Sequence, residues 1–159
     1  MTHLSKGEKA PDFKDLPTDG DGTVSLGDFK GRMLVLYFYP KDDTSGCTKE
    51  ACAFEANLKS LDNCGVSVVG VSKDSVKKHD KFKEKYNLSL PLISDEETDL
   101  CERYGVWKEK SMYGRSYMGI ERSTFLIDGD GTIQRVWPKV KVNGHVEDVL
   151  EAVKQAKAA

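Results

Sequence analysis

The spacing of apolar residues changes between two patterns along the chain, which together predict alternating strands and helices. Residues 34–39 and 66–72 are dominated by Val, Leu and aromatic side chains, which is typical of strands buried on both faces. Residues 47–61 and 74–86 instead place apolar side chains three and four positions apart, as on one face of a helix. The same helical spacing returns at residues 146–153.

Shorter segments lie between and before these elements. Residues 91–93 indicate a short extended piece, and residues 99–104 indicate a short helix. Residues 123–127 and 132–137 flank an Asp-Gly turn, which predicts an antiparallel hairpin. The stretch around residues 23–26 is expected to add a smaller hairpin near the N-terminus.

The order of these elements predicts the fold class. A strand–helix–strand unit followed by a hairpin and a closing helix is the order of a thioredoxin-like α/β domain. We therefore expect a central mixed sheet flanked by helices, with an added N-terminal β-hairpin, in a single domain of residues 1–159. Residues 107–121 show no clear period, and their Gly, Ser and Tyr content predicts an ordered loop near the functional site.

Composition limits the classes of partner. Hydrophobic residues make up 38% and charged residues 31%, which favours a soluble globular protein. The net charge of −2 gives no electrostatic basis for binding nucleic acid or an anionic membrane. The N-terminus has no apolar signal region, and no segment approaches the roughly 20 apolar residues of a membrane span. We therefore expect a cytoplasmic protein.

Two motifs resemble metal-binding sites, but each lacks part of the required set of ligands. Asp-Gly-Asp-Gly-Thr occurs at residues 19–23 and 128–132, as at the start of a calcium loop, but Lys30 and Lys139 stand where a bidentate Glu is needed. Both copies are better explained as turns. The C-x4-C pair lacks a second pair of ligands at a metal-binding spacing, so a zinc site is not expected either.

Cys47 is the candidate for chemistry. It follows the apolar strand of residues 34–39 and a polar loop, and it comes in the first turn of the helix predicted for residues 47–61. Unpaired backbone N–H groups and the helix dipole favour negative charge at a helix start. A cysteine there should ionise more readily than a free thiol, and the thiolate is the nucleophile. Basic Lys41 and Lys49 are also nearby in the sequence, which indicates a thiol or redox enzyme.

A second cysteine, Cys52, follows five residues later. The helical spacing places Cys47 toward the protein body with Ala51 and Phe54, and Cys52 on a more polar flank. Residues five apart in an intact helix have Cα atoms about 8–9 Å apart, whereas a disulfide needs less than about 7 Å. If the two cysteines bond, the first turns of the helix must therefore unwind.

The remaining cysteines and histidines offer alternatives. Cys64 and Cys101 compete with Cys52 as partners of Cys47, although both fit small packed residues and a short loop closes more readily. His79 is expected to be packed or capped rather than catalytic. The histidines share no spacing with Cys47, which disfavours a Cys-His hydrolase.

Several motifs together resemble the peroxiredoxins, in particular the peroxiredoxin Q or bacterioferritin comigratory protein branch. The superfamily pattern Pro-x-x-x-Thr-x-x-Cys is present as Pro40, Thr44 and Cys47, and Cys52 completes the C-x4-C typical of many members of this branch. Gly46 and Glu50 fit the same motif. Further similarity lies in residues 37–40, 104–107, 113–115 and 121–128. Ser45 replaces a frequent proline, and we expect this serine to cap the helix instead.

The resemblance implies a role for each motif residue. Cys47 would be the peroxidatic cysteine, which attacks the peroxide and becomes a sulfenic acid. Thr44 would orient the peroxide, Pro40 would shield the site, and Arg122 would stabilise the thiolate and the charge that develops as the O–O bond breaks. Cys52 would resolve the sulfenic acid as an intramolecular disulfide.

The resemblance also implies partners. The substrates would be hydrogen peroxide and organic hydroperoxides, and a thioredoxin-type dithiol protein would reduce the disulfide. The protein would be a monomer or a weak dimer that needs no metal, haem or flavin. An alternative is a thioredoxin-like oxidoreductase or redox sensor acting on protein disulfides, but Cys-x-x-Cys is absent at the helix start. A scaffold domain would not explain the motif set.

Overall fold

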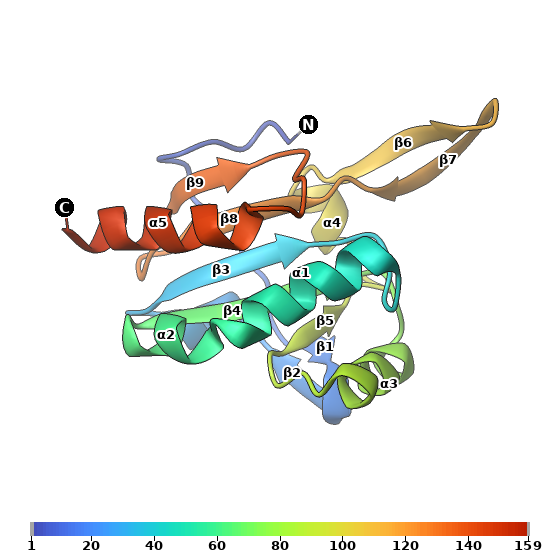
Figure 1. Ribbon diagram of the computed structural model, residues 1–159. Coiled ribbons are helices and arrows are strands. Elements are labelled where there is room, and N and C mark those ends of the chain that lie inside the picture. The colour runs from blue at the N-terminus through green and yellow to red at the C-terminus, as the bar shows by residue number, and fades with distance from the viewer. Residues whose placement is uncertain (1, 159) are drawn as a thin grey trace.

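The computed structural model describes residues 2–158, and it has a seven-stranded mixed sheet with helices on both faces (Figure 1). The strands of this sheet are β1 (Leu16–Thr18), β2 (Gly22–Val24), β3 (Met33–Phe38), β4 (Val66–Ser72), β5 (Leu92–Ser94), β8 (Ser123–Ile127) and β9 (Ile133–Trp137). Their spatial order is β2-β1-β5-β4-β3-β8-β9. β3 runs parallel to β4 and antiparallel to β8, which confirms the predicted mixed sheet.

In the part of the chain that the structure describes, five α-helices connect and cover these strands. They are α1 (Ser45–Ala56), α2 (Leu58–Asn63), α3 (Val76–Tyr86), α4 (Leu100–Arg103) and α5 (His145–Ala158). Two short 3-10 turns, η1 (Asp19–Asp21) and η2 (Leu26–Phe29), complete the N-terminal part around the predicted β1–β2 hairpin. In residues 2–158 there is no helix that combines the length and the apolarity of a membrane span.

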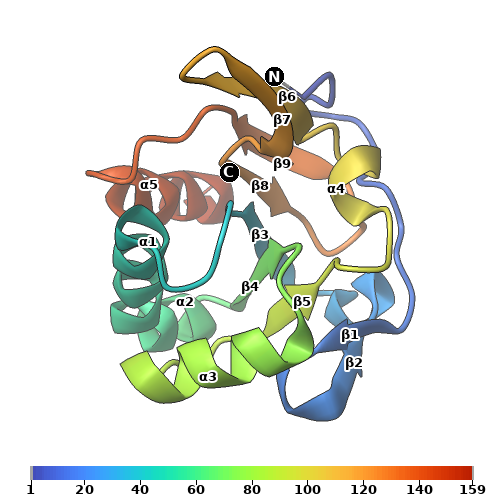
Figure 2. The same cartoon turned by 90° about the vertical axis from the view of Figure 1, so that its right-hand side faces the viewer.

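Strand β3 shows how the sheet divides the core. Its alternate side chains Val35 and Tyr37 belong to an apolar cluster with α1, α2, α3 and α5. Leu34 and Leu36 belong to a second cluster with α4 and the N-terminal segment. Both faces of β3 are therefore buried, which is why its sequence is continuously apolar. Figure 2 shows α1, α2 and α3 on one side of the sheet and α4 on the other.

The helix predicted for residues 47–61 is wrong in one respect, because it is two helices. Asn57 ends α1 with φ −109° and ψ 6°, and its side-chain amide donates to the carbonyl of Ala53 at 2.8 Å. An Asn side chain competes with the backbone for hydrogen bonds in this way, and it interrupts the regular helix.

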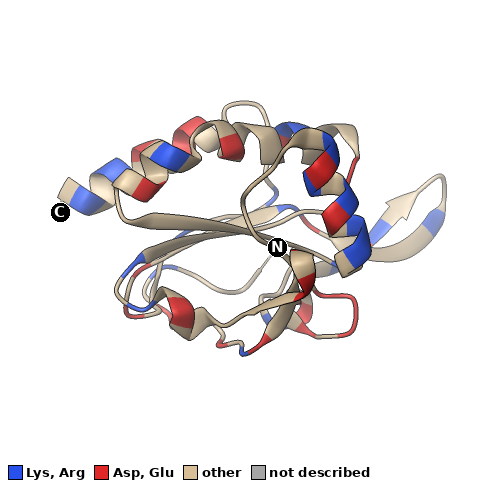
Figure 3. Cartoon of the chain, turned by 90° about the horizontal axis from the view of Figure 1, so that it is seen from below, with Lys and Arg blue, Asp and Glu red and all other residues tan. Residues whose placement is uncertain are grey.

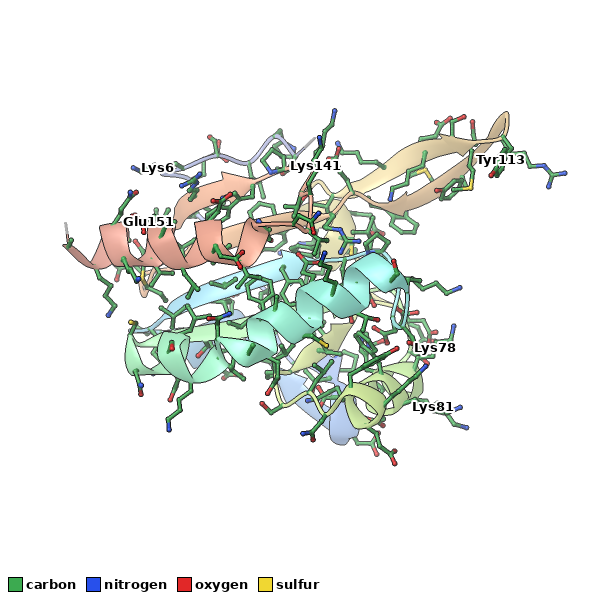
Figure 4. All side chains as sticks on the ribbon, in the orientation of Figure 1. Lys6, Lys78, Lys81, Tyr113, Lys141 and Glu151 are labelled. Atoms are coloured by element: carbon green, nitrogen blue, oxygen red, sulfur yellow. The ribbon has the colours of Figure 1, made fainter. Side chains whose placement is uncertain are left out.

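The loop predicted for residues 107–121 is also wrong. These residues form a projecting hairpin, β6 (Trp107–Met112) and β7 (Arg115–Ile120), which extends beyond the main sheet (Figure 1). Tyr113 and Gly114 both have positive φ, 52° and 77°, as a tight two-residue hairpin turn requires. Tyr113 at the tip is 97% exposed and points away from the body of the protein (Figure 4), so it does not line the site.

Most lysines of α3 lie on its solvent-exposed face, as its amphipathic pattern suggests, whereas Lys83 is mostly buried and pairs with Asp19. Lys78 and Lys81 point outward in Figure 4, whereas Phe82 and His79 on the opposite face are buried. Basic and acidic residues are interspersed along the helices in Figure 3, consistent with the nearly balanced net charge.

Candidate active site

Cys47 lies at the start of α1, immediately beyond the loop that leaves β3. Thr44 is the N-cap residue, so Cys47 is the third residue of the helix. Its side chain is 1% exposed and packs with Ala51 and Phe54 in the cluster that covers β3. The expected position in the first helical turn and the expected inward direction are both confirmed.

A guanidinium group lies directly against this cysteine. Arg122 Nη2 is 3.4 Å from Cys47 Sγ, and Arg122 Nη1 donates to Glu50 Oε1 at 2.7 Å. The sheet explains how residues 75 positions apart meet. Phe38 pairs with Ser123 at the end of the antiparallel β3–β8 ladder. Arg122, the residue before Ser123, therefore lies at the end of β3 where the chain enters the Cys47 loop. Cys47, Glu50 and Arg122 thus form one cluster, the thiol–guanidinium cluster.

Burial controls the charges in this cluster. The carboxyl of Glu50 has no exposed surface, and burial raises its pKa to about 7 although Arg122 opposes the shift. Burial also acts to lower the pKa of Arg122, but the negative charges of Glu50 and Cys47 outweigh it and raise that pKa. The guanidinium therefore remains charged and holds two acidic groups at once.

Gly46 is explained by the close approach of Arg122. A Cβ atom at position 46 would lie 3.2 Å from Arg122 Nη2, a tight contact that would push the guanidinium slightly away. The expectation that Ser45 caps the helix is wrong, because the N-cap is Thr44 and Ser45 is the first helical residue. Thr44 occupies that place because its extended backbone turns the chain into the helix.

Thr44 and Pro40 lie in the loop that supports this turn. The Thr44 hydroxyl donates to the Lys41 carbonyl at 2.8 Å and makes no side-chain cap. Thr44 is exposed and Pro40 is half-buried, between β3 and the loop. Their expected roles toward peroxide stay predictions. The position of both residues beside the start of α1 is compatible with those roles.

Cys52 lies on the exposed flank of α1, as its spacing predicts, and its thiol is free. Both cysteines belong to one uninterrupted helix, Ser45–Ala56. The unwinding expected for a bond between Cys47 and Cys52 therefore remains required by helix geometry.

The other two cysteines differ from each other. Cys64 is exposed at the C-cap of α2, so the expectation of a buried small residue is wrong there. Helix α2 ends with this residue, and its side chain leaves the core while Leu61 remains in it. Cys101 is buried, as expected, and burial together with Asp95 raises the pKa of its thiol far above the ordinary value. Cys101 is therefore a packing residue.

Two features next to the site carried no sequence signal. Tyr37 lies in the middle of β3, stacks on Phe54 at 4.7 Å between ring centroids, and has a buried hydroxyl. Burial raises the pKa of Tyr37, and the nearby charges of Glu50 and Cys47 raise it further. The sequence presents this tyrosine within an apolar run and within the family motif of residues 37–40, and neither assigns its hydroxyl a role.

The second feature is a buried polar group beside the loop, formed by Asp42, Asp74 and His79. Possible ligand atoms of these three residues lie within 4.8 Å of one another, the spacing of a metal site. Each of them, however, makes hydrogen bonds to protein groups, and His79 uses both ring nitrogens. The expectation that His79 is a packed residue is confirmed.

A thioredoxin-like fold that holds a buried cysteine against a guanidinium, at a helix start, has the arrangement of a thiol peroxidase. The model of the AhpC/TSA family matches residues 6–136, and the chain belongs to this family.

Curated relatives agree along nearly the whole chain. A protein named putative peroxiredoxin bcp from Coxiella burnetii is 57% identical over 147 residues, covering 92% of this chain and 97% of that protein. Peroxiredoxin Bcp of Bacillus subtilis is 51% identical, covering 93% of this chain and 94% of that protein. The expected peroxiredoxin resemblance is confirmed, and this chain is a peroxiredoxin with thiol peroxidase activity.

Solved structures agree in fold. PrxQ of Xylella fastidiosa, crystallised as a cysteine-to-serine mutant, superposes with a TM-score of 0.92 at 40% identity, covering 98% of this chain and 99% of that one. Bacterioferritin comigratory protein of Xanthomonas campestris superposes with a TM-score of 0.88 at 43% identity and covers 99% of both chains. The expected thioredoxin-like fold is thereby confirmed.

Proposed function

We propose that Cys47 is the peroxidatic residue and that this chain reduces hydrogen peroxide and alkyl hydroperoxides. The observation that carries the proposal is the 3.4 Å contact between Arg122 Nη2 and the buried Cys47 Sγ at a helix start. In the first step the thiolate attacks one peroxide oxygen and the O–O bond breaks. Cys47 becomes a sulfenic acid, and the departing alkoxide or hydroxide takes up a proton. The Xanthomonas relative is described by its alkyl peroxide reduction activity, which supports the alkyl substrates.

The residues around Cys47 fit distinct parts of this step. Arg122 stabilises the thiolate and the negative charge on the peroxide oxygens, and Glu50 fixes the guanidinium through its second nitrogen. Free backbone N–H groups of the first turn of α1 offer further donors. Thr44 orients the peroxide through its hydroxyl, and Pro40 shields the site.

Cys52 then resolves the intermediate. Its sulfur attacks the Cys47 sulfenic acid, a disulfide forms and water leaves. A thioredoxin-type dithiol protein supplies two electrons that return both cysteines to thiols. The exposure of Cys52 supports this order, because the resolving thiol must be reachable once the first turns of α1 unwind. Four free cysteines suit a reducing compartment, so we also propose a cytoplasmic location. The resemblance to the peroxiredoxin Q branch supports our further proposal that the protein is a monomer.

The roles of the cysteines are tested by single substitutions. Cys47→Ser is expected to abolish fast oxidation in a stopped-flow assay of the reduced protein with hydrogen peroxide. Cys52→Ser is expected to complete one turnover and then to stall with thioredoxin as the only reductant. Cys64→Ser is the matched control, because it removes an exposed cysteine outside the site.

Mass spectrometry of the oxidised protein gives the decisive result. A single linkage between Cys47 and Cys52 is expected after one equivalent of peroxide. Full, sustained turnover of Cys52→Ser with thioredoxin would move the resolving role to Cys64 or Cys101. Oxidation of the wild type no faster than that of a free thiol would refute the peroxidatic role of Cys47.

A further inference from the structure

The loop that carries Pro40 and Thr44 is tied to α3 by a buried polar network outside the thiol–guanidinium cluster. Asp42, in the middle of this loop, is 8% exposed. Its carboxylate accepts from the Tyr39 hydroxyl at 2.5 Å and contacts His79 Nδ1 at 2.7 Å. Its backbone N–H donates to Asp74 Oδ2 at 2.8 Å. Both the side chain and the backbone of one loop residue are therefore held.

The partners of His79 define its protonation. His79 Nε2 lies 2.9 Å from the carbonyl oxygen of Ile93, which only accepts, so Nε2 carries a hydrogen. Nδ1 faces the Asp42 carboxylate, which also accepts. The arrangement is that of an imidazolium paired with a carboxylate, and His79 itself has no exposed surface. Burial lowers the pKa of His79, but Asp42 more than compensates and raises it.

This buried pair connects the loop to the rigid part of the fold. His79 belongs to α3 and bonds to β5 through Ile93, while Ser72 at the end of β4 donates to Asp74 at 2.7 Å. The loop in turn carries the helix start, because the Thr44 hydroxyl bonds to Lys41 and the Thr48 N–H donates to the Thr44 carbonyl at 2.8 Å. The position of the first turn of α1 is therefore set from α3.

We propose that Asp42 and His79 are positioning residues that fix the start of α1 and oppose the unwinding through which Cys47 reaches Cys52. The inference rests on the proposed peroxidase mechanism. Cys47 follows Thr44 by only three positions, so with Thr44 held the Cα atom of Cys47 stays within roughly 10 Å of the Thr44 Cα atom. Releasing the loop enlarges the set of unwound conformations and favours that state by entropy. The pair thus sets how long the sulfenic acid remains in the thiol–guanidinium cluster.

Three substitutions separate this role from general stability. Asp42→Ala removes the anchor. Asp42→Asn keeps its geometry without charge, because the amide oxygen accepts from Tyr39 and the amide nitrogen donates to a neutral His79 that retains its bond to Ile93. Asp43→Asn is the matched control on the same loop. Asp43 is exposed, bonds to Lys85 and Tyr86, and has a positive φ of 58° that asparagine tolerates.

The experiment follows a single turnover. Reduced protein is mixed with hydrogen peroxide and quenched at set times, and mass spectrometry measures sulfenic acid, disulfide and sulfinic acid. With Asp42→Ala, loss of a charge-assisted bond should speed disulfide formation about tenfold. The sulfinic fraction at excess peroxide should fall in proportion, because the sulfenic acid has less time to react again. Asp42→Asn and Asp43→Asn should remain within about twofold of the wild type.

A purely structural role would lower the melting temperature of Asp42→Ala without changing the rate of disulfide formation, and that result would overturn the proposal. Should Asp42→Ala fail to fold, His79→Gln gives the same answer, because glutamine can donate to only one of the two acceptors at a time. A wild type that forms no Cys47–Cys52 disulfide would remove the resolving mechanism and this inference together. That outcome is visible before any variant is made.

Discussion

Arg122 is the residue whose removal should have the largest effect among the neighbours of Cys47. Arg122→Met keeps a long apolar side chain but removes the donor 3.4 Å from Sγ and the partner of Glu50. A hydrogen bond to a charged group contributes roughly 1.5–3 kcal/mol. The side chain of Arg122 is only 16% exposed, so water does not replace the bond. At about 1.4 kcal/mol for each factor of ten, the rate with peroxide should fall roughly 10- to 150-fold.

Protonation of Glu50 should limit the loss of folding stability in Arg122→Met. Its pKa is already raised to about 7 by burial, and Arg122 is the group that opposes that shift. Without the guanidinium the carboxyl is expected to bind a proton at neutral pH rather than remain as an isolated buried charge. Arg122→Met should therefore stay folded. Its free energy of unfolding should fall by much less than its activation free energy for the reaction with peroxide rises.

Two further variants allow the effects of these contacts on the rate with peroxide to be ranked. Arg122→Lys keeps the charge, but a single ammonium does not reproduce the fork that spans Glu50 and Cys47. Glu50→Gln keeps Arg122 and loses only the ionic support of the guanidinium. We expect the second-order rate constant with hydrogen peroxide, measured by stopped flow, to fall most in Arg122→Met and least in Glu50→Gln. An Arg122→Met rate within about twofold of the wild type would refute the catalytic importance of the contact.

Two stability predictions concern other buried positions. Burial lowers the pKa of His145 to about 4, whereas an unfolded histidine titrates near 6.5, so only the unfolded chain gains this proton as the pH falls from 6.5 to 4. His145 should lower the free energy of unfolding by about 3 kcal/mol as the pH falls over that range. In urea unfolding, the His145→Asn variant should lose less stability than the wild type over the same range. The two proteins must be compared at each pH, because the raised pKa of Glu50 has the opposite effect on stability between pH 4.5 and 7. Gly129→Ala should destabilise by about 1–3 kcal/mol in the same assay, because its Cβ would lie 2.9 Å from the Gly31 backbone, whereas Gly27→Ala meets open space and should be near wild type.

The sequence predicted best the strands of the main sheet, whose apolar side chains pack into the core. Strand β4 was expected at residues 66–72 and lies at Val66–Ser72, and the β8–β9 hairpin was expected within one residue of its observed limits. The β6–β7 hairpin failed for the opposite reason. Most of it is exposed, so its side chains carry no alternation, and Tyr113-Gly114 lacks the Asn-Gly or Asp-Gly signal of a tight turn.

The residues of the candidate site also differ in how well the sequence predicts them. Cys47 could be predicted from local pattern, because a strand, a polar loop and a helix start follow each other directly in the sequence. Arg122 could be predicted only from the family motif, because its distance to Cys47 depends on the pairing of β3 with β8. The contact of Asp42 with His79 had no signal of either kind. It joins residues 37 positions apart through side chains that are ordinary in a loop and on a helix.

The first turn of α1 is held mainly by contacts with the rest of the protein rather than by its own helix propensity. Thr44 provides no side-chain cap, and Gly46 is a poor helix former. What holds the turn is the burial of Cys47, its contact with Arg122, and the loop that α3 holds in place. In the proposed mechanism, oxidation to a neutral sulfenic acid weakens the ionic contact with Arg122 while leaving the loop anchored. The chemical step thus removes one of the forces that oppose unwinding at the moment when Cys47 must move toward Cys52.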